Sequence, residues 1–249
     1  MDTFGDLKFW AIVISIISLA FSIYPTIRNW LKGRRLQIEP QDAVMLSHQL
    51  GYTNLNWALT LVNTGGLTIR VKNLHIVLKK DGEAVKIPMR NFYRNFDAKA
   101  PSLYSPITLK PGEEATHVFC FFHKLPRSED KALGELIWQA SQEISKPVGR
   151  ALDTPFNMAQ PLKLSEEILS KIHAIFQENF YLKCGEYEIS VHAQDENNKN
   201  ITSRICRFTI FESDERNLRL VTERYSSGDG ITYHSEQNVW FYTSLTDIQ

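Results

Sequence analysis

The chain has 249 residues, and its 28 Lys and Arg residues are balanced by 28 Asp and Glu residues. This balance argues against a protein built mainly to bind nucleic acid, which would carry a basic excess. A hydrophobic fraction of 43% and a charged fraction of 22% exclude a disordered chain and a multi-span membrane protein. Cys120, Cys184 and Cys206 match no zinc or disulfide-scaffold spacing, so we expect reduced thiols.

The amino terminus holds the clearest pattern in the sequence. Residues 9–27 are 19 consecutive uncharged positions between Lys8 and Arg28. At about 1.5 Å per residue, this length is just sufficient to cross a hydrocarbon core of about 30 Å. Trp10 and Tyr24 lie near the two ends, where aromatic rings favour the lipid headgroups. The pattern therefore predicts a transmembrane helix over residues 9–27.

A cleaved signal peptide and a buried globular helix are the competing interpretations of this segment. A signal peptide needs a basic start and small residues at its cleavage site. The tail over residues 1–8 instead contains Asp2 and Asp6, and residues 24–28 read Tyr-Pro-Thr-Ile-Arg. Length and flanks thus favour an uncleaved anchor over both competing interpretations.

The segment after the predicted helix, residues 28–35, is basic. It contains Arg28, Lys32, Arg34 and Arg35 and no acidic residue. The positive-inside rule keeps this side in the cytoplasm, so the N-terminus lies outside and the C-terminal domain inside. With no organelle signal in the sequence, we expect a single pass through a bacterial inner (plasma) membrane. The four side chains either only set this topology or also contact anionic lipid, at about 1 kcal/mol each.

Small residues form one face of the predicted helix. Ala11, Ser15, Ser18 and Ser22 are spaced four, three and four positions apart, which aligns them on a helix. Small residues let two membrane helices approach, and serine hydroxyls can bond across the interface. Alternatively, each hydroxyl bonds back to its own helix. Self-association through this helix is therefore one of two open interpretations.

From residue 36 the sequence changes to short alternating runs. Residues 55–61 place large apolar side chains at every second position, as in a strand with one face in a core. Residues 63–66, Asn-Thr-Gly-Gly, tolerate positive φ and predict a tight connection. Residues 80–82, Lys-Asp-Gly, predict a hairpin turn. We expect an antiparallel β-domain assembled from residues 36–123 and 183–224.

Between residues 124 and 182 the apolar spacing becomes helical. Two stripes follow helical periodicity, and they consist of Leu133, Leu136, Ile137, Ala140 and Ile144, and of Ile168, Ile172, Ile175 or Phe176, and Phe180. A segment this long exceeds what a strand connection requires. It forms either a lid on the β-domain or a surface for a partner, and an aromatic tail follows over residues 225–249.

Three sequence runs resemble immunoglobulin-like β-sandwiches. LKPGEEATHVFCFF places a Pro-Gly turn before an apolar strand, GEYEISV opens a late strand with Gly-x-Tyr, and FTIF follows after a polar turn. The resemblance covers residues 36–123 and 183–224. It implies a mainly β fold, an antiparallel sandwich with a helical insertion. It implies no activity, because such sandwiches carry many functions.

Motifs for catalysis and cofactor binding are absent from the sequence. It contains no phosphate-binding loop, dinucleotide fingerprint, nucleophile elbow or His-Glu-x-x-His helix. His117 and His123 would lie about 20 Å apart on one strand, too far to share a metal. Cys120, in a Phe-rich run, is expected to be a small core residue. We therefore predict no catalytic residue, no metal site and no cofactor.

Two short runs are candidates for recognition. Arg90, Tyr93 and Arg94 lie in the run 90–96, which combines Arg with aromatic residues, the types that dominate binding hot spots. Alternatively, the Phe side chains of this run fill the edge of the sandwich. Trp240 lies in the run 239–242 of the tail, which alternatively pairs with residues 231–233 as a last hairpin.

These patterns together favour a single-pass, membrane-anchored binding, sensing or scaffold module with a cytoplasmic β-sandwich. The expected partners are the membrane, another protein and, through the helix, a second copy of the chain. The alternatives are a membrane-tethered, hydrolase-like enzyme with its site between sandwich and insertion, and an effector that perturbs the membrane when triggered.

Overall fold

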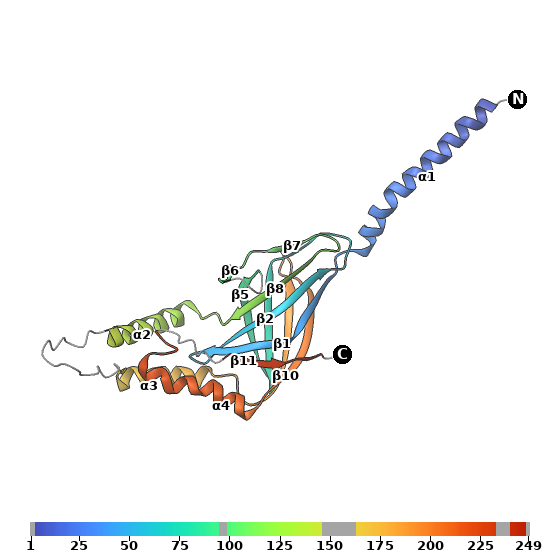
Figure 1. Ribbon diagram of the computed structural model, residues 1–249. Helices are drawn as coiled ribbons and strands as arrows, with labels where there is room; N and C mark the ends of the chain where they lie inside the picture. Colours follow the sequence, from blue (N-terminus) through green and yellow to red (C-terminus); the bar gives the residue numbers. More distant parts are fainter. Residues whose placement is uncertain (1–2, 95–98, 146–162, 233–239, 248–249) are drawn as a thin grey trace.

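A computed structural model describes residues 3–94, 99–145, 163–232 and 240–247 of the chain. A long helix, α1 (Thr3–Lys32), leads into a β-rich body (Figure 1). Helices α2 (Arg127–Ser145) and α3 (Glu166–Asn179) lie at the opposite end of that body. We call these two ends of the body the anchor end, where α1 leaves, and the helical end.

The body is mainly antiparallel β-sheet, as the sequence predicts. Its main sheet has the path β11-β1-β2-β8-β5-β4-β9-β10-β12, with β6 paired to β5, and β3 and β7 form a separate pair. The strands are β1 (Leu36–Gln49), β2 (Tyr52–Asn63), β3 (Ile69–Val71), β4 (Asn73–Lys80), β5 (Glu83–Tyr93), β6 (Ser102–Leu103), β7 (Ile107–Leu109), β8 (Glu114–Phe122), β9 (Gly185–Gln194), β10 (Asn200–Ile210), β11 (Phe241–Ser244) and β12 (Thr246–Asp247).

The C-terminal segment makes this sheet nearly closed. β11 pairs antiparallel with β1, with Phe241 opposite Leu46, and β12 then pairs antiparallel with β10, with Thr246 opposite Arg207. Residues 239–242 were expected to pair with residues 231–233. Val239 and Tyr233 lie outside the described residues, but the pairing of Phe241 with β1 shows a different partner. We call the boundary between β1 and β10 the seam.

An immunoglobulin-like sandwich is not confirmed. The strands follow one path from β1 through β2, β8, β5, β4 and β9 to β10, in place of two facing sheets. The local motifs behind the resemblance are present, since residues 111–112 turn into β8 and Gly185 opens β9. Such motifs determine the ends of strands, whereas the choice between sandwich and closed sheet depends on pairing between distant strands.

Alternate strand positions fill the interior of the nearly closed sheet. In β2, Leu55, Trp57, Leu59 and Leu61 are fully buried, as the alternation predicts. The indole Nε1 of Trp57 donates to the carbonyl of Gln41, 3.3 Å away, within the irregularity of β1 between residues 40 and 44. A small closed sheet of this kind has its interior occupied by side chains.

Three helical segments cover the helical end. The predicted stripes are present, and α3 buries Ile168, Ile172 and Phe176 in the same apolar core as the strands. The chain after β10 forms a helix that the sequence analysis did not predict, α4 (Glu212–Leu220), followed by a 3-10 turn, η1 (Val221–Ser227). Leu218 and Tyr225 from these segments join that core. The helices therefore act as a cover over apolar residues of the sheet.

The last turn of α1 is joined directly to the body. The Gly65 amide donates to the Arg35 carbonyl at 3.1 Å, and the Gly66 amide donates to the Gly33 carbonyl at 2.8 Å. A Cβ atom on Gly66 would lie 1.7 Å from the Asn29 carbonyl oxygen. Neither Gly65 nor Gly66 adopts the positive φ expected from the sequence. Glycine is instead required here because two backbones touch.

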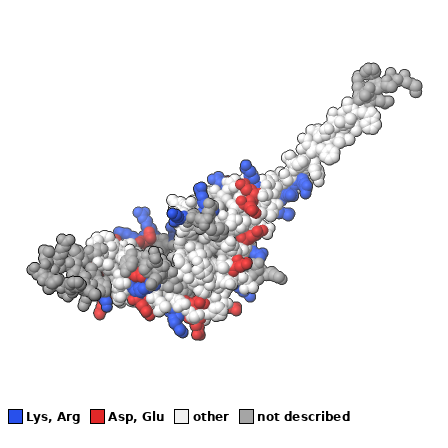
Figure 2. Space-filling view, viewed as in Figure 1, with Lys and Arg blue, Asp and Glu red and all other residues white. Residues whose placement is uncertain are grey.

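Helix α1 beyond this joint is apolar and exposed. Phe9–Lys32 has a mean hydropathy of 1.9, and its apolar window is not buried by any part of the body. Figure 2 shows the described part of this helix as a rod free of charged side chains until it reaches the body. By length and composition, it is the one helix among the described residues that could span a membrane.

The close approach of Gly66 to α1 predicts that Gly66→Ala opens the joint. The added methyl group has to displace the Asn29 backbone, so the two backbone hydrogen bonds weaken. We expect tryptic cleavage after Arg34 or Arg35 to become about tenfold faster. This corresponds to a decrease of about 1.4 kcal/mol in the free energy of local opening. Mass spectrometry of the fragments measures the rate.

Gly134→Ala is the matched control, because a Cβ at this position of α2 meets no atom within 4 Å. It should raise the free energy of unfolding by about 1 kcal/mol and leave cleavage at the joint unchanged. Equal cleavage rates in the two variants would contradict the direct packing of the turn on α1.

Candidate functional site

The predicted basic cluster lies where α1 meets the body. Arg28 and Lys32 belong to the last turns of α1, Arg34 and Arg35 follow directly, and all four side chains are exposed. Figure 2 shows basic side chains gathered at this junction. Their position suits both interpretations of the cluster, a topology determinant and a contact with lipid headgroups.

The small-residue face of α1 is exposed along its length. The hydroxyl of Ser15 donates to the Ala11 carbonyl of its own helix, 2.8 Å away, as in the non-associating interpretation of this face. Ser18 and Ser22 continue the face and are exposed. Self-association through Ala11, Ser15, Ser18 and Ser22 stays a prediction.

The predicted recognition residues do not converge. Arg90, Tyr93 and Arg94 lie at the anchor end of β5, whereas Trp240 precedes β11, which β1, β2 and β8 separate from β5 in the sheet. Phe92 of the same run is buried, with its ring centroid 6.2 Å from that of Phe119. This part of the run thus contributes to the core, while Asn95 and Phe96 lie outside the described residues.

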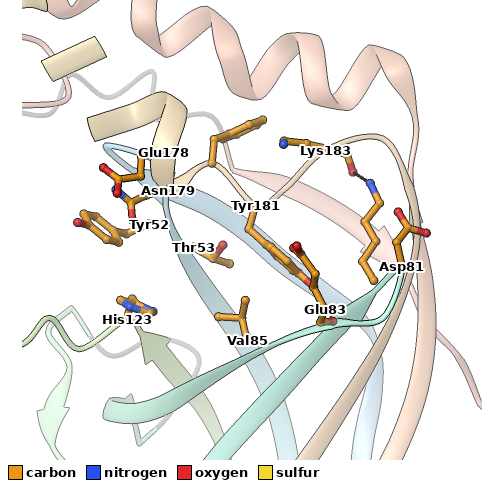
Figure 3. Close-up of a pocket in the computed structure, with 12 residues that line it drawn as sticks. Tyr52, Thr53, Asp81, Glu83, Val85, His123, Glu178, Asn179, Tyr181 and Lys183 are labelled. Carbon is orange, nitrogen blue, oxygen red and sulfur yellow. Dashed lines mark hydrogen bonds between the residues drawn. The ribbon is translucent and has the colours of Figure 1, made fainter. Parts of the chain in front are cut away.

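A cleft of about 590 Å³ lies at the helical end, where sequence analysis named no site residue (Figure 3). It is bounded by the start of β2, the β4–β5 hairpin, the residue after β8 and the C-terminal end of α3. The residues that line it are Tyr52, Thr53, Lys80, Asp81, Glu83, Val85, His123, Glu178, Asn179, Phe180, Tyr181 and Lys183. We call this depression the hairpin cleft.

An aromatic pair forms one side of the hairpin cleft. The rings of Tyr52 and His123 are stacked, with centroids 5.5 Å apart and planes 19° apart. Burial, and then the carboxylates of Glu129 and Glu178, raise the pKa of Tyr52 above its ordinary value. Its hydroxyl therefore stays protonated at neutral pH, and it presents a donor toward neighbouring carboxylates.

The opposite side of the hairpin cleft is formed by the β4–β5 turn. Asp81 and Gly82 both have positive φ, 50° and 86°, as the predicted tight hairpin requires. The Lys80 ammonium donates to the Lys183 carbonyl at 3.2 Å, and the Tyr181 hydroxyl donates to the Glu83 carbonyl, also at 3.2 Å (Figure 3). These polar groups hold the turn against the segment that follows α3.

A second depression of about 670 Å³ lies between α2 and α3, and we call it the helix groove. Its apolar lining includes Leu133, Leu136 and Ile175, and its acidic lining consists of Glu129, Glu135 and Glu178. Tyr52, Glu178 and Asn179 line both depressions, so the helix groove and the hairpin cleft adjoin.

A polar contact ties α2 to α3 beside the groove. Glu143 of α2 accepts bonds from the amide of Ser165 at 2.8 Å and from its hydroxyl at 2.9 Å. Ser165 occupies the N-cap position of α3, but its hydroxyl does not cap that helix. The contact joins the end of α2 to the start of α3, and neither residue lines the groove.

Two candidate nucleophiles, Ser190 and Cys120, line neither depression. The Ser190 hydroxyl is 2.9 Å from Nε2 of His192, but Ser190 is buried on β9 and lines neither depression. Burial raises the pKa of the Cys120 thiol to about 12, so the thiolate is not populated at neutral pH. No group of three His, Cys, Asp or Glu side chains among the described residues could hold a metal.

Sequence reasoning missed both depressions because their walls come from separate parts of the chain. The acidic residues of α2 had a sufficient local explanation, since carboxylates favour the start of a helix. Only the spacing of Ala132, Leu133 and Leu136 against Ala174 and Ile175 hinted at two apolar faces that could meet.

No family model matches this chain, and searches of characterised proteins and of solved structures also found no match. The function has to be sought in the chain's own surfaces. The helix groove and the hairpin cleft each combine apolar and polar lining residues, as ligand and partner sites commonly do.

A histidine pair on the outside of the sheet predicts that stability falls on acidification. His75 and His192 stack with centroids 5.0 Å apart. Burial, then Lys86 and His192, lower the pKa of His75 from 6.5 to about 4. Between these pH values the unfolded chain binds the extra proton and the folded chain does not, so the free energy of unfolding decreases as pH falls.

After allowance for solvent screening, we expect His75 to account for about 1–2 kcal/mol of this loss. Urea unfolding of wild type and His75→Asn at pH 7, 5.5 and 4.5 measures it, and the variant should show the flatter profile. His48 and His192, whose pKa values burial also lowers, contribute to the remaining slope. So does Glu215 at the lowest pH, because, against the effect of burial, the Cys184 amide and Arg219 lower the pKa of its carboxyl. Identical slopes in the two proteins would rule out His75 as the titrating group.

Proposed function

We propose that this protein is a single-pass, membrane-anchored recognition module. Its helix groove binds a basic, amphipathic segment of a partner protein. The observation that carries the proposal is the placement of the groove at the helical end of the body, with α1 at the opposite end (Figure 1). A partner can therefore reach the groove while α1 occupies a membrane.

Membrane anchoring is supported by the exposed apolar surface of α1. Bulky side chains such as Phe9, Ile16 and Phe21 are more than half exposed in the structure, and the body does not cover them. A soluble protein rarely exposes a continuous apolar surface of this size. The basic residues at the anchor end favour a cytoplasmic location of the body.

The lining of the helix groove supports an amphipathic occupant. Leu133 and Ile175 are partly buried, Leu136 is buried, and all three belong to the apolar part of the lining. Helix-in-groove recognition uses such surfaces, with apolar side chains at every third or fourth position as anchors.

The charges around the groove support a basic occupant. Glu129, Glu135 and Glu178 line it, and Glu135 is also paired with Lys131 at 3.7 Å. Its one basic residue, Lys171, is paired with Glu167 at 2.6 Å. Lys or Arg residues beside the apolar face of a partner would meet this acidic rim, and such complementarity sets orientation and association rate. Among the described residues, no observation favours the tethered enzyme or the membrane-perturbing effector as a second function.

Photo-cross-linking tests the groove in intact cells. p-Benzoylphenylalanine at Ala174, which is exposed and lines the groove, should cross-link one partner segment. Gln177, exposed on the same helix and outside the lining, is the matched position and should give no such product. Mass spectrometry of the cross-linked peptide should show Lys or Arg flanking apolar residues at helical spacing.

Charge reversal tests the acidic rim in the same assay. Glu178→Lys should lower the cross-link yield about tenfold, because it replaces an attraction for a basic partner by a repulsion. The tenfold decrease corresponds to a loss of about 1.4 kcal/mol in binding free energy. Glu114→Lys, an equal change at the anchor end, should leave it unchanged. Equal yields from Ala174 and Gln177, or an acidic cross-linked segment, would refute this function.

The proposed orientation predicts that a reporter active only in oxidising compartments gives no signal when fused after Gln249. A cytoplasmic reporter at the same position should be active, because the positive-inside rule keeps the body in the cytoplasm. Glycosylation of Asn200, in the sequon Asn200-Ile201-Thr202, during expression in a eukaryotic host would contradict this topology.

A further inference from the structure

The half of the seam nearest α1 is not closed by the C-terminal strands. β11 pairs with residues 43–46 of β1, and β12 pairs with residues 206–207 of β10. Residues 36–42 of β1 and 200–205 of β10 have no strand partner across the seam among the described residues. A cleft of about 730 Å³ lies there, and we call it the seam cleft.

Arginines from two distant parts of the chain line the seam cleft. Arg34 and Arg35 line it from the segment between α1 and β1, and Arg204 lines it from β10. All three side chains are exposed. Hydroxyl groups of Thr64, Thr202 and Ser203 also belong to the lining, as do the apolar residues Leu36, Ile38, Ile201 and Leu245.

The charge of the seam cleft changes along its length. Its two acidic residues, Glu39 and Asp42, lie farther along β1, away from α1. The Glu39 carboxylate accepts a bond from the Gln37 amide nitrogen at 3.0 Å. The end of the cleft beside α1 is therefore the basic end.

The joint with α1 places this basic end next to the membrane. From residue 27, where the uncharged run ends, to Lys32 the helix rises by about 8 Å, at about 1.5 Å per residue. One headgroup layer is about 5–8 Å thick, from total and hydrocarbon thicknesses. Arg34 and Arg35 thus lie at the outer border of the headgroups, and the bonds from Gly65 and Gly66 hold the seam there.

We infer that the seam cleft binds the phosphate group of an anionic phospholipid from the membrane that α1 spans. The inference rests on the proposed anchoring of α1. Guanidinium groups bind phosphate oxygens in a bidentate manner, and Arg34, Arg35 and Arg204 supply three of them at one cleft. The apolar lining suits the glycerol and ester region, and a free phosphate would make no use of it.

The full chain in nanodiscs provides the test. Carbonate extraction of cell membranes comes first. Release of the chain into the soluble fraction would refute the anchoring by α1. Retention of the chain in the membrane fraction would support the anchoring, and the lipid test then examines the seam cleft. Lipid selection is then measured by native mass spectrometry of protein ejected from nanodiscs of phosphatidylcholine with one-fifth phosphatidylglycerol. We expect retained phosphatidylglycerol to exceed its share of the bilayer.

Arg204 is the informative position, because it lies outside the basic segment that follows α1. Arg204→Gln should lower phosphatidylglycerol retention about fivefold, as for the loss of about 1 kcal/mol. Arg204→Lys should also lower it, because lysine keeps the charge but loses the bidentate geometry. Arg216→Gln, an exposed arginine of α4, is the matched control and should retain lipid as wild type does.

Three results would overturn the inference. Retention in proportion to the bilayer composition would show no site. Equal losses in Arg204→Gln and Arg216→Gln would show attraction by overall charge only. Competition by millimolar inorganic phosphate that removes the lipid completely would identify free phosphate as the ligand. Thermal unfolding of each variant confirms that the fold is retained before these comparisons are made.

Discussion

Strand direction at the two sides of the seam is the constraint on which the body depends. β1 and β10 both begin at the anchor end, so they cannot pair antiparallel with each other. The C-terminal strands run opposite to both, and they therefore bridge β1 and β10 with antiparallel pairing on either side. Because β11 and β12 are short, the bridge covers only part of the seam. The open part lies beside α1, which gives the seam cleft its position.

The filled interior of the sheet explains why the helix groove and the seam cleft lie outside it. Trp57, Phe119, Phe121 and Tyr187 occupy the space between the strands and are almost completely buried. A ligand therefore has access to the surface between covering helices, or to the seam, but not to the centre of the sheet. In the hairpin cleft, Lys80 and Tyr181 donate hydrogen bonds to backbone carbonyl groups of neighbouring loops. These hydrogen bonds hold the β4–β5 turn against the segment that follows α3.

The two ends of the body have different neighbours, and their composition follows. At the anchor end, a glycine turn holds α1 by backbone contact, and arginines gather beside it. At the helical end, α2 and α3 bury one apolar face each in the core but leave part of their facing surfaces in an acidic groove. The proposed function uses this polarity: α1 would hold one end of the body at a membrane, and the other end would bind the partner.

The sequence by itself determined the features that have a local period. Alternation in β2, the tight β4–β5 turn, the stripes of α2 and α3 and the apolar length of α1 are confirmed, because one buried face or one turn leaves its pattern in neighbouring residues. The path of the sheet, the partners of the C-terminal strands and the role of Gly66 were decided only by tertiary structure. Tertiary structure also decided that Arg34, Arg35 and Arg204 line one cleft, and that Tyr52 and Glu178 line another. These depend on contacts between segments far apart in the chain, whose free energy is gained only when the strands choose partners, and no local pattern records that choice.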